Sequence, residues 1–210
     1  IIEGRFLKHF AFQLPKKQLG ECRAAGNEIS VASARRFHQL LDNALGNMRS
    51  SVTRNQVTYV HAGSGIPLVG SNYFGIIDRG SNVIEVRPLS GCNENCNYCS
   101  VDEGVISRKI RDFVVEKDYL VAEFRKLAAF KECGVEAHIN AQGEPTLYEP
   151  LASLIADIAA TNNVEMVSLV TNGSLLDEKK IRELAAAGLK RFQLSLHAMD
   201  ERKAKILAGT

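Results

Sequence analysis

The chain has 210 residues, of which 45% are hydrophobic and 24% charged, with 26 Lys and Arg against 24 Asp and Glu. This composition suits one sizeable domain, alone or with a small extension, and excludes a disordered tail. The net charge of +2 gives no whole-chain argument for nucleic acid or an anionic membrane as partner. We expect neither a membrane span nor a secretory signal, and a cut or processed N-terminus, because residue 1 is Ile rather than Met.

Residues 1–60 differ in charge from the rest of the chain. They carry nine Lys and Arg against four Asp and Glu, whereas the remainder carries 17 against 20. We expect an extended stretch near Phe6–Leu14 and a helix near Ala32–Met48. The apolar residues at helical spacing in that helix are Phe37, Leu40, Leu41 and Leu45. Two interpretations stay open, a cap packed on the rest or an accessory module that binds RNA. We favour the cap, because the positive charge is not interleaved with aromatic residues.

Residues 61–82 contain Pro67 and many Gly, Ser and Asn, which predicts a connector or loop. From residue 83 onward, apolar strands alternate with amphipathic helices. The predicted strands are Val83–Val86, Ala137–Ala141, Val164–Val170 and Phe192–Leu196. The predicted helices are Tyr119–Phe130, ended by Gly134, one opened by Pro150, one capped by Asp177 and ended by Gly188, and one from Glu201. This alternation predicts right-handed βαβ units and a parallel sheet, an α/β fold.

The loop after the first predicted strand carries Cys92, Cys96 and Cys99, spaced C-x3-C-x2-C. Cys22 and Cys133 stand alone, and this odd, clustered count favours a metal or redox site over a disulfide framework. We therefore expect reduced thiols and a cytoplasmic location. Three thiolates on one loop can converge on one soft metal centre. Structural zinc and ordinary iron–sulfur sites use four ligands, so a three-Cys [4Fe–4S] cluster would leave one iron open.

The three later strands also end in polar residues. These ends are Gln142-Gly143-Glu144-Pro145, Thr171-Asn172-Gly173 and Ser195-Leu196-His197. In barrel-like and open α/β sheets, ligands bind at the carboxyl ends of the strands. The sequence therefore predicts one site built from four successive strand ends.

With these motifs, residues 83–210 resemble the radical SAM superfamily. The cysteine loop with Tyr98 before its last Cys resembles the superfamily's signature, and the three later strand ends resemble its S-adenosylmethionine (SAM) motifs. The segments Ile76–Gly80 and Cys99–Asp102 are similar to uncharacterised archaeal Fe–S oxidoreductase-like members. Gln142 stands where the usual first Gly of the second-strand motif would be, and no fifth-strand motif is found.

The resemblance implies a partial (β/α) barrel with its first four strands, residues 83–210, joined by the 61–82 connector to an α+β N-terminal extension, residues 1–60. Two further barrel units would need roughly 50–60 residues, so we expect that the chain ends early. The resemblance also implies a cluster held by Cys92, Cys96 and Cys99. Once reduced, that cluster cleaves SAM to methionine and a 5′-deoxyadenosyl radical, which abstracts hydrogen from a substrate that the resemblance does not identify.

The implied SAM contacts divide by the part of the cofactor that they touch. Tyr98 borders the adenine, and Gly143 and Glu144 bind the methionyl amino group, next to Gln142 as a further cofactor-binding residue. Thr171, Asn172, Ser195 and His197 shape the methionyl and ribose pocket. The implied electron donor is flavodoxin-like or ferredoxin-like.

Three alternatives stay open. One is a non-catalytic Fe–S redox protein, and another is a zinc-stabilised binding module with His138 or Cys133 as fourth ligand. The third concerns the Ser107–Asp112 loop, whose basic residues either approach an anionic substrate or are simply solvated, and we favour the solvated loop. His9, His38 and His61 are expected to be ordinary side chains.

Overall fold

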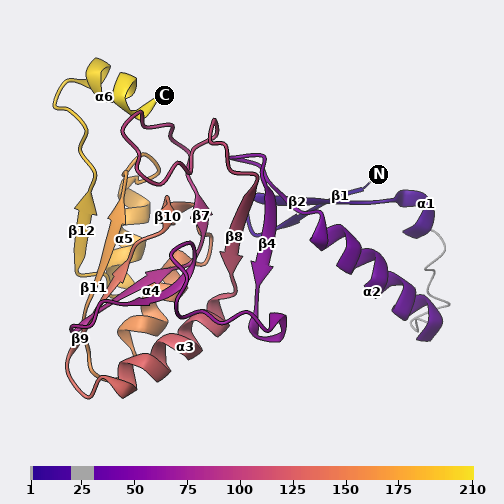
Figure 1. The fold of residues 1–210 in the computed structure, drawn as a ribbon, viewed down its shortest axis with the longest axis horizontal. Helices are drawn as coiled ribbons and strands as arrows, with labels where there is room; N and C mark the ends of the chain where they lie inside the picture. Colours follow the sequence, from indigo (N-terminus) through magenta and orange to yellow (C-terminus); the bar gives the residue numbers. More distant parts are fainter. Residues whose placement is uncertain (1, 20–30) are drawn as a thin grey trace.

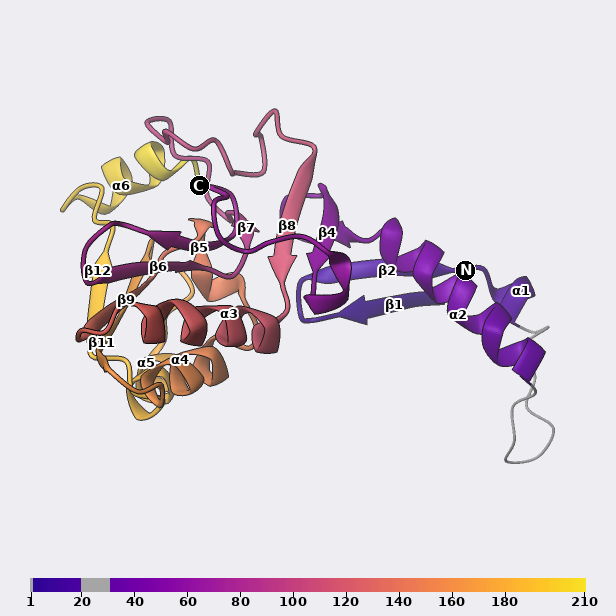
Figure 2. The ribbon, with the colours of Figure 1, turned by 60° about the horizontal axis from the view of Figure 1, so that its bottom comes forward.

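The computed structural model describes residues 2–19 and 31–210, so Cys22 lies outside the described residues. Its main sheet has five strands in the order β12-β11-β9-β6-β5 (Figures 1 and 2). The strands are β5 (Gly75–Asp78), β6 (Val83–Arg87), β9 (Val135–Ile139), β11 (Val164–Thr171) and β12 (Arg191–Leu194). β6, β9, β11 and β12 are parallel neighbours, which confirms the four predicted strands and the predicted α/β, partial-barrel fold.

The helices that follow these strands match their predicted positions. They are α3 (Lys117–Phe130), α4 (Leu151–Ala159), α5 (Glu178–Ala186) and α6 (Glu201–Ala208). Figure 2 shows α3, α4 and α5 along one side of the main sheet. The Asp177 carboxylate accepts a hydrogen bond from Lys180 N (2.6 Å), which caps α5. Gly188, with φ +102°, ends that helix in the left-handed region as predicted.

Gly134 does not end α3, so that prediction is wrong. The helix stops at Phe130, and the left-handed residue after it is Glu132, with φ +51°. Gly134 instead lies directly before β9, where a Cβ atom would come within 2.0 Å of the Glu165 carboxylate. Its lack of a side chain serves this close approach between neighbouring strands.

The predicted connector is wrong over residues 75–78, because β5 is a strand of the main sheet, antiparallel to β6. Ile76 in this strand is fully buried. Gly75 has φ +91°, and a Cβ atom there would lie 2.1 Å from Leu68 O. The glycine therefore marks a close backbone contact and not a loop.

A second five-stranded sheet, in the order β1-β2-β3-β4-β8, contains most of the N-terminal region. Its elements, with two helices, are β1 (Ile2–Phe6), β2 (Phe10–Leu14), α1 (Lys16–Leu19), α2 (Val31–Gly46), β3 (Arg49–Ser50), β4 (Gln56–Val60) and β8 (Arg111–Val115). The extended stretch expected near Phe6–Leu14 is the second half of the β1–β2 hairpin. β4 pairs in parallel with β8, so this sheet crosses the boundary predicted at residue 60.

The apolar face predicted for α2 is only partly buried. Figure 1 shows α2 running away from the main sheet beside β1 and β2, and Phe37 is exposed. Ala44, in the last turn, is buried, and so is Met48, which was predicted to end the helix but lies two residues after it. The helix therefore packs through its last turn, which periodicity alone does not show.

Two short pairings complete the fold. β7 (Ser90–Gly91) and β10 (Gln142–Gly143) form a parallel pair, and a 3₁₀ helix, η2 (Pro145–Leu147), follows β10. A second 3₁₀ helix, η1 (Ala62–Ser64), follows β4. None of the helices in the described ranges has the length and apolar character needed to cross a membrane.

Candidate active site

The carboxyl ends of the parallel strands surround one cavity of about 460 Å³. All eleven residues that the sequence predicts for the site line this cavity: Cys92, Cys96, Tyr98, Cys99, Gln142, Gly143, Glu144, Thr171, Asn172, Ser195 and His197. They come from the loop after β6, from β10 and the residue after it, from the end of β11 and the residue after it, and from the loop after β12. The parallel sheet thus brings together four segments that are distant in sequence. His9, His38 and His61 lie elsewhere, as expected for ordinary side chains.

Backbone hydrogen bonds hold the cysteine loop. Cys92 N donates to Glu103 O (2.8 Å), and Asn95 N donates to Ala208 O (2.8 Å) at the end of α6. The thiols of Cys92 and Cys96 are half-buried, whereas Cys99 is exposed, and all three are free. The loop is thus anchored at both flanks while its thiols face the cavity.

Burial raises the pKa of the Cys92 thiol to about 12 and also raises the pKa of Cys96. The neighbouring carboxylates of Glu94 and Glu144 act in the same direction on Cys92. Without a metal, both thiols are therefore protonated at neutral pH. Binding a soft metal centre would displace these protons, because the metal ligand is the thiolate.

Glu144 is the most completely bonded polar group in the cavity wall. Its carboxylate is buried and accepts hydrogen bonds from Thr171 Oγ1 (2.6 Å) and Asn172 N (2.8 Å). It also accepts from Thr146 N (2.9 Å) and Thr146 Oγ1 (2.5 Å). The ends of β10 and β11 are therefore locked together around one carboxylate.

Gly143 and Gln142 occupy the same edge of the cavity. Gly143 has φ +140°, and a Cβ atom there would lie 2.0 Å from Gly91 O, so no other residue fits. The Gln142 side-chain oxygen accepts a hydrogen bond from Arg87 Nη1 (2.6 Å). Arg87 also pairs with Glu85 (2.9 Å), which fixes the guanidinium.

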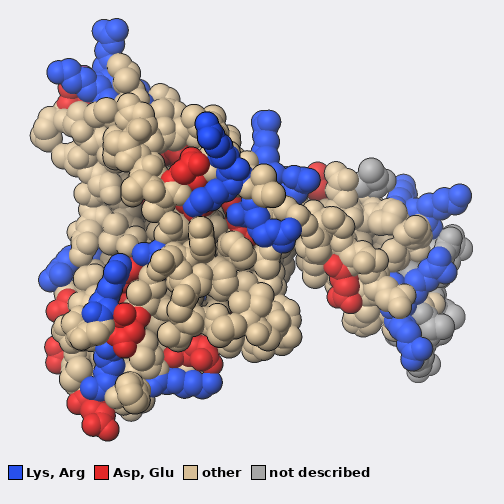
Figure 3. Space-filling model, in the orientation of Figure 1, with Lys and Arg blue, Asp and Glu red and all other residues tan. Residues whose placement is uncertain are grey.

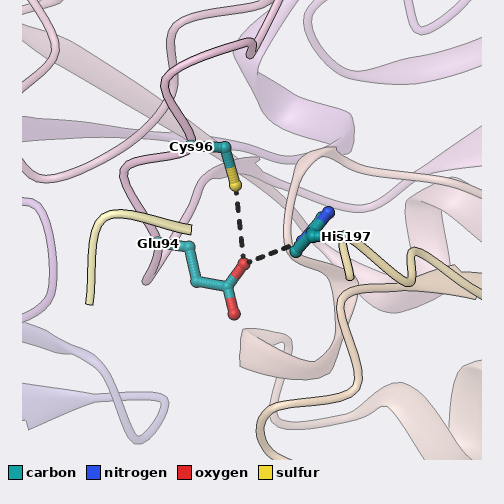
Figure 4. A group of neighbouring side chains, drawn as sticks. All are labelled: Glu94, Cys96 and His197. Carbon is teal, nitrogen blue, oxygen red and sulfur yellow. Dashed lines mark hydrogen bonds and ion pairs between the residues drawn. The ribbon is translucent and has the colours of Figure 1, made fainter. Parts of the chain in front are cut away.

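Figure 4 shows a group that the sequence prediction missed in part, Glu94, Cys96 and His197. Glu94 is buried, and its Oε2 atom lies 3.6 Å from both Cys96 Sγ and His197 Nε2. His197 Nε2 is buried without a hydrogen-bond partner, and its other ring nitrogen contacts the Tyr98 hydroxyl. The position of Glu94 inside the cysteine loop was the one available sequence signal.

Neither residue proposed to complete a zinc site lines the cavity. His138 lies on β9 with its ring 3.4 Å from Glu136, and Cys133 is an exposed thiol beyond α3. Within the described ranges, the side chains placed to hold one metal ion are Glu94, Cys96 and His197. A zinc site completed by His138 or Cys133 is therefore not supported.

The basic residues after the cysteine loop are engaged mostly by the protein itself. Lys109 Nζ donates to Val101 O (2.6 Å) and pairs with the buried Glu103 carboxylate. Arg111 is not in a loop, since β8 begins there, and it donates to Thr58 Oγ1 and Gln56 Oε1 (both 2.9 Å). Figure 3 shows a group of Lys and Arg side chains near the upper end of β8. The contacts of Lys109 and Arg111 favour a structural role over capture of an anionic substrate.

The cavity fits a three-thiolate cluster and a small ligand that carries its own polar groups. The three thiols are free, Gly143 lines the cavity, and His197 Nε2 has no hydrogen-bond partner among the described residues. The family model of the Radical SAM superfamily matches residues 86–210, which are more than half of the chain. The chain belongs to the radical SAM superfamily. This confirms the resemblance stated from the motifs.

The curated relatives of this superfamily member are longer proteins. An uncharacterized protein of Methanocaldococcus jannaschii is 44% identical over 167 residues, which are 78% of this chain and 38% of that protein. The GTP 3′,8-cyclase of Peptoclostridium acidaminophilum is 31% identical over 126 residues, 60% of this chain and 37% of that protein. The chain thus spans less than two fifths of the length of these relatives.

Solved structures similar to this superfamily member include BtrN in complex with AdoMet and 2-DOIA. It is 22% identical, with a TM-score of 0.48 over 60% of this chain and 49% of that one. Spore photoproduct lyase complexed with dinucleoside spore photoproduct is 15% identical, with a TM-score of 0.45 over 91% of this chain and 62% of that one.

Proposed function

We propose that the chain is the SAM-binding part of a radical SAM enzyme. Cys92, Cys96 and Cys99 would hold a [4Fe–4S] cluster, whose open iron leaves room for SAM beside Glu144. The observation that supports this proposal most is the single cavity, which the three free thiols share with the Glu144 network. The reduced cluster would supply the electron that splits SAM into methionine and a 5′-deoxyadenosyl radical, which takes hydrogen from a substrate.

The protein's own residues would bind and orient SAM. Gly143 and Glu144, which line the cavity, would bind the methionyl amino group, and the Glu144 carboxylate keeps the neighbouring ends of β10 and β11 in place. Thr171 and Asn172 follow from the β11 end, while Ser195 and His197 come from the loop after β12. The Tyr98 hydroxyl contacts His197, so these two residues would together border the nucleoside. Gln142 would act through backbone atoms, because its side chain is bound to Arg87.

The electron would come from a flavodoxin-like or ferredoxin-like donor. Thiols that hold a cluster need a reducing compartment, so we place the protein in the cytoplasm. This chain matches little more than a third of the length of the relative named GTP 3′,8-cyclase, so the substrate of that relative is not carried over.

The test is anaerobic reconstitution with iron and sulfide, followed by EPR of the reduced chain with and without SAM. We expect a [4Fe–4S]⁺ signal that changes when SAM is added. Cys96→Ala should lose the cluster, whereas Cys133→Ala, which removes an exposed thiol outside the cavity, should keep it. A Cys96→Ala variant with intact SAM cleavage would disprove the assignment.

Two alternatives predict different results in the same experiment. A cluster signal indifferent to SAM would favour a non-catalytic Fe–S redox protein. Zinc retained in place of iron would favour a metal-stabilised binding module, for which Glu94, Cys96 and His197 are the ligands within reach.

A further inference from the structure

A buried carboxylate joins the N-terminal sheet to the loop that precedes the cysteines. Asp112, on β8, is 1% exposed. Its Oδ2 atom accepts a hydrogen bond from Thr53 Oγ1 (2.5 Å), and its Oδ1 atom accepts one from Asn55 Nδ2 (2.8 Å). Both donors lie in the turn between β3 and β4, outside the residues that match the superfamily.

Asp112 and Thr53 lie directly against Gly91. Gly91 has φ +95°, and a Cβ atom at this position would lie 3.0 Å from Asp112 Oδ2 and 3.3 Å from Thr53 Cγ2. The neighbouring Ser90 is held from the same side, because its Oγ accepts a hydrogen bond from Phe113 N (2.9 Å). One side of the β7 backbone therefore packs against the group formed by Thr53, Asn55 and Asp112.

The other side of β7 contacts β10 and Glu144, which line the cavity. Gly91 O accepts a hydrogen bond from Glu144 N (3.0 Å), and β7 pairs in parallel with β10. A displacement of Gly91 must therefore move Gly143 and Glu144, because their backbones are in contact. Gly91 also directly precedes Cys92 in the chain.

We propose that Thr53 and Asn55 are positioning residues for the SAM site. Through Asp112 they hold the Gly91 peptide, which sets the position of Gly143 and Glu144. The role assigned to that edge of the cavity rests on the proposed function, but the mechanical link can be tested without any cofactor. The N-terminal region would thus support the wall of the cavity.

The first test measures amide hydrogen exchange in the metal-free chain. Thr53→Val keeps the shape of the side chain and removes the donor to Asp112, so we expect the Glu144 amide to exchange about tenfold faster. Thr53→Ser should restore slow exchange. Thr58→Val is the matched control, because Thr58 lies on β4 and its hydroxyl accepts a hydrogen bond from the exposed Arg111.

The pattern of exchange separates positioning from general destabilisation. We expect the faster exchange at β7 and β10 and unchanged exchange across β11. A uniform increase, or no increase at Glu144, would overturn the proposal. Asn55→Ala removes the second donor to Asp112 and should give the same pattern if Thr53→Val does not fold.

The second test measures SAM affinity from the SAM-dependent EPR change of the reconstituted chain. We expect Thr53→Val to bind SAM about tenfold more weakly at unchanged iron content, and Thr58→Val to bind normally. Unchanged affinity in Thr53→Val would contradict the proposal. If the wild-type chain binds a cluster but no SAM, the proposed function fails, and the exchange experiment still decides whether Thr53 positions Glu144.

Discussion

The two ends of the cavity hold their buried carboxylates very differently. Glu144, between β10 and β11, accepts hydrogen bonds from both the backbone and two threonine hydroxyls. Glu94, in the cysteine loop, has a thiol and an imidazole, each at 3.6 Å. β11 has a neighbouring strand on each side, whereas β12, which supplies His197, has a neighbour only on one side among the described strands. The end of the cavity at Glu144 is therefore held by a complete set of hydrogen bonds before any ligand binds. The end at Glu94 and His197, the looser end, is held by fewer and longer contacts.

The strongest way to test this difference is Glu144→Ala. It leaves four donors without their acceptor inside the protein, so we expect the free energy of unfolding to fall by about 3 kcal/mol. Urea denaturation measures the change. Glu149→Ala removes an exposed carboxylate of the same type and should change little. A fall in the free energy of unfolding of less than about 1 kcal/mol for Glu144→Ala would contradict the view that these hydrogen bonds hold this end of the cavity.

Lys109→Ala should have the next largest effect. Glu103 is 2% exposed and Lys109 is its cationic partner, so the variant leaves a buried carboxylate unpaired. We expect a loss of about 2 kcal/mol, below the full cost of breaking a buried pair because Lys109 is itself partly exposed. The adjacent Arg108→Ala, at an exposed position, is the control and should stay within about 0.5 kcal/mol. Equal effects of the two variants would show that Glu103 does not depend on Lys109.

Asp112 offers a smaller, pH-dependent test. Burial raises the pKa of its carboxyl above the ordinary value of 3.8, although the hydrogen bonds from Thr53 and Asn55 oppose the shift. From that value up to the raised pKa, the folded chain binds more protons than the unfolded chain, so stability falls as the pH rises. Asp112→Asn cannot titrate, and its stability should fall less between pH 4 and pH 7. Urea denaturation at several pH values gives the free energy of unfolding of both proteins. The same slope of this free energy against pH in the wild type and the variant would refute the expectation.

The smallest effect on stability is expected at the looser end. His197→Ala removes a ring whose Nε2 atom has no hydrogen-bond partner, so we expect a change within about 1 kcal/mol. The same variant should weaken SAM binding, because the ring borders the proposed nucleoside pocket. His38→Ala, on the exposed face of α2, should alter neither quantity. A loss of stability as large as that of Glu144→Ala would show that the two ends of the cavity are held equally strongly, which contradicts the comparison.

Much of the site was predictable because its residues follow strands of a strong βαβ pattern. The spacing of Cys92, Cys96 and Cys99 and the polar ends after three later strands were enough to place eleven side chains around one cavity. Glu94 was missed because its position inside the cysteine loop, the one signal in the sequence, does not by itself distinguish a buried carboxylate from a solvated one. Arg87 and Glu103 were missed for the same reason, since their burial depends on partners elsewhere in the chain.

The sequence by itself determined how strands and helices alternate along the chain from residue 83, where the cysteine loop lies, and which superfamily the motifs belong to. Hydrophobic periodicity and motif spacing are local properties, so they can be read without the tertiary structure. Only the tertiary structure showed that β5 belongs to the main sheet and that β4 pairs with β8. It alone brought Thr53 and Asn55 against Asp112, far away in the sequence. Such contacts depend on how sheets meet, and a buried polar group finds its partners only once the backbone around it has closed.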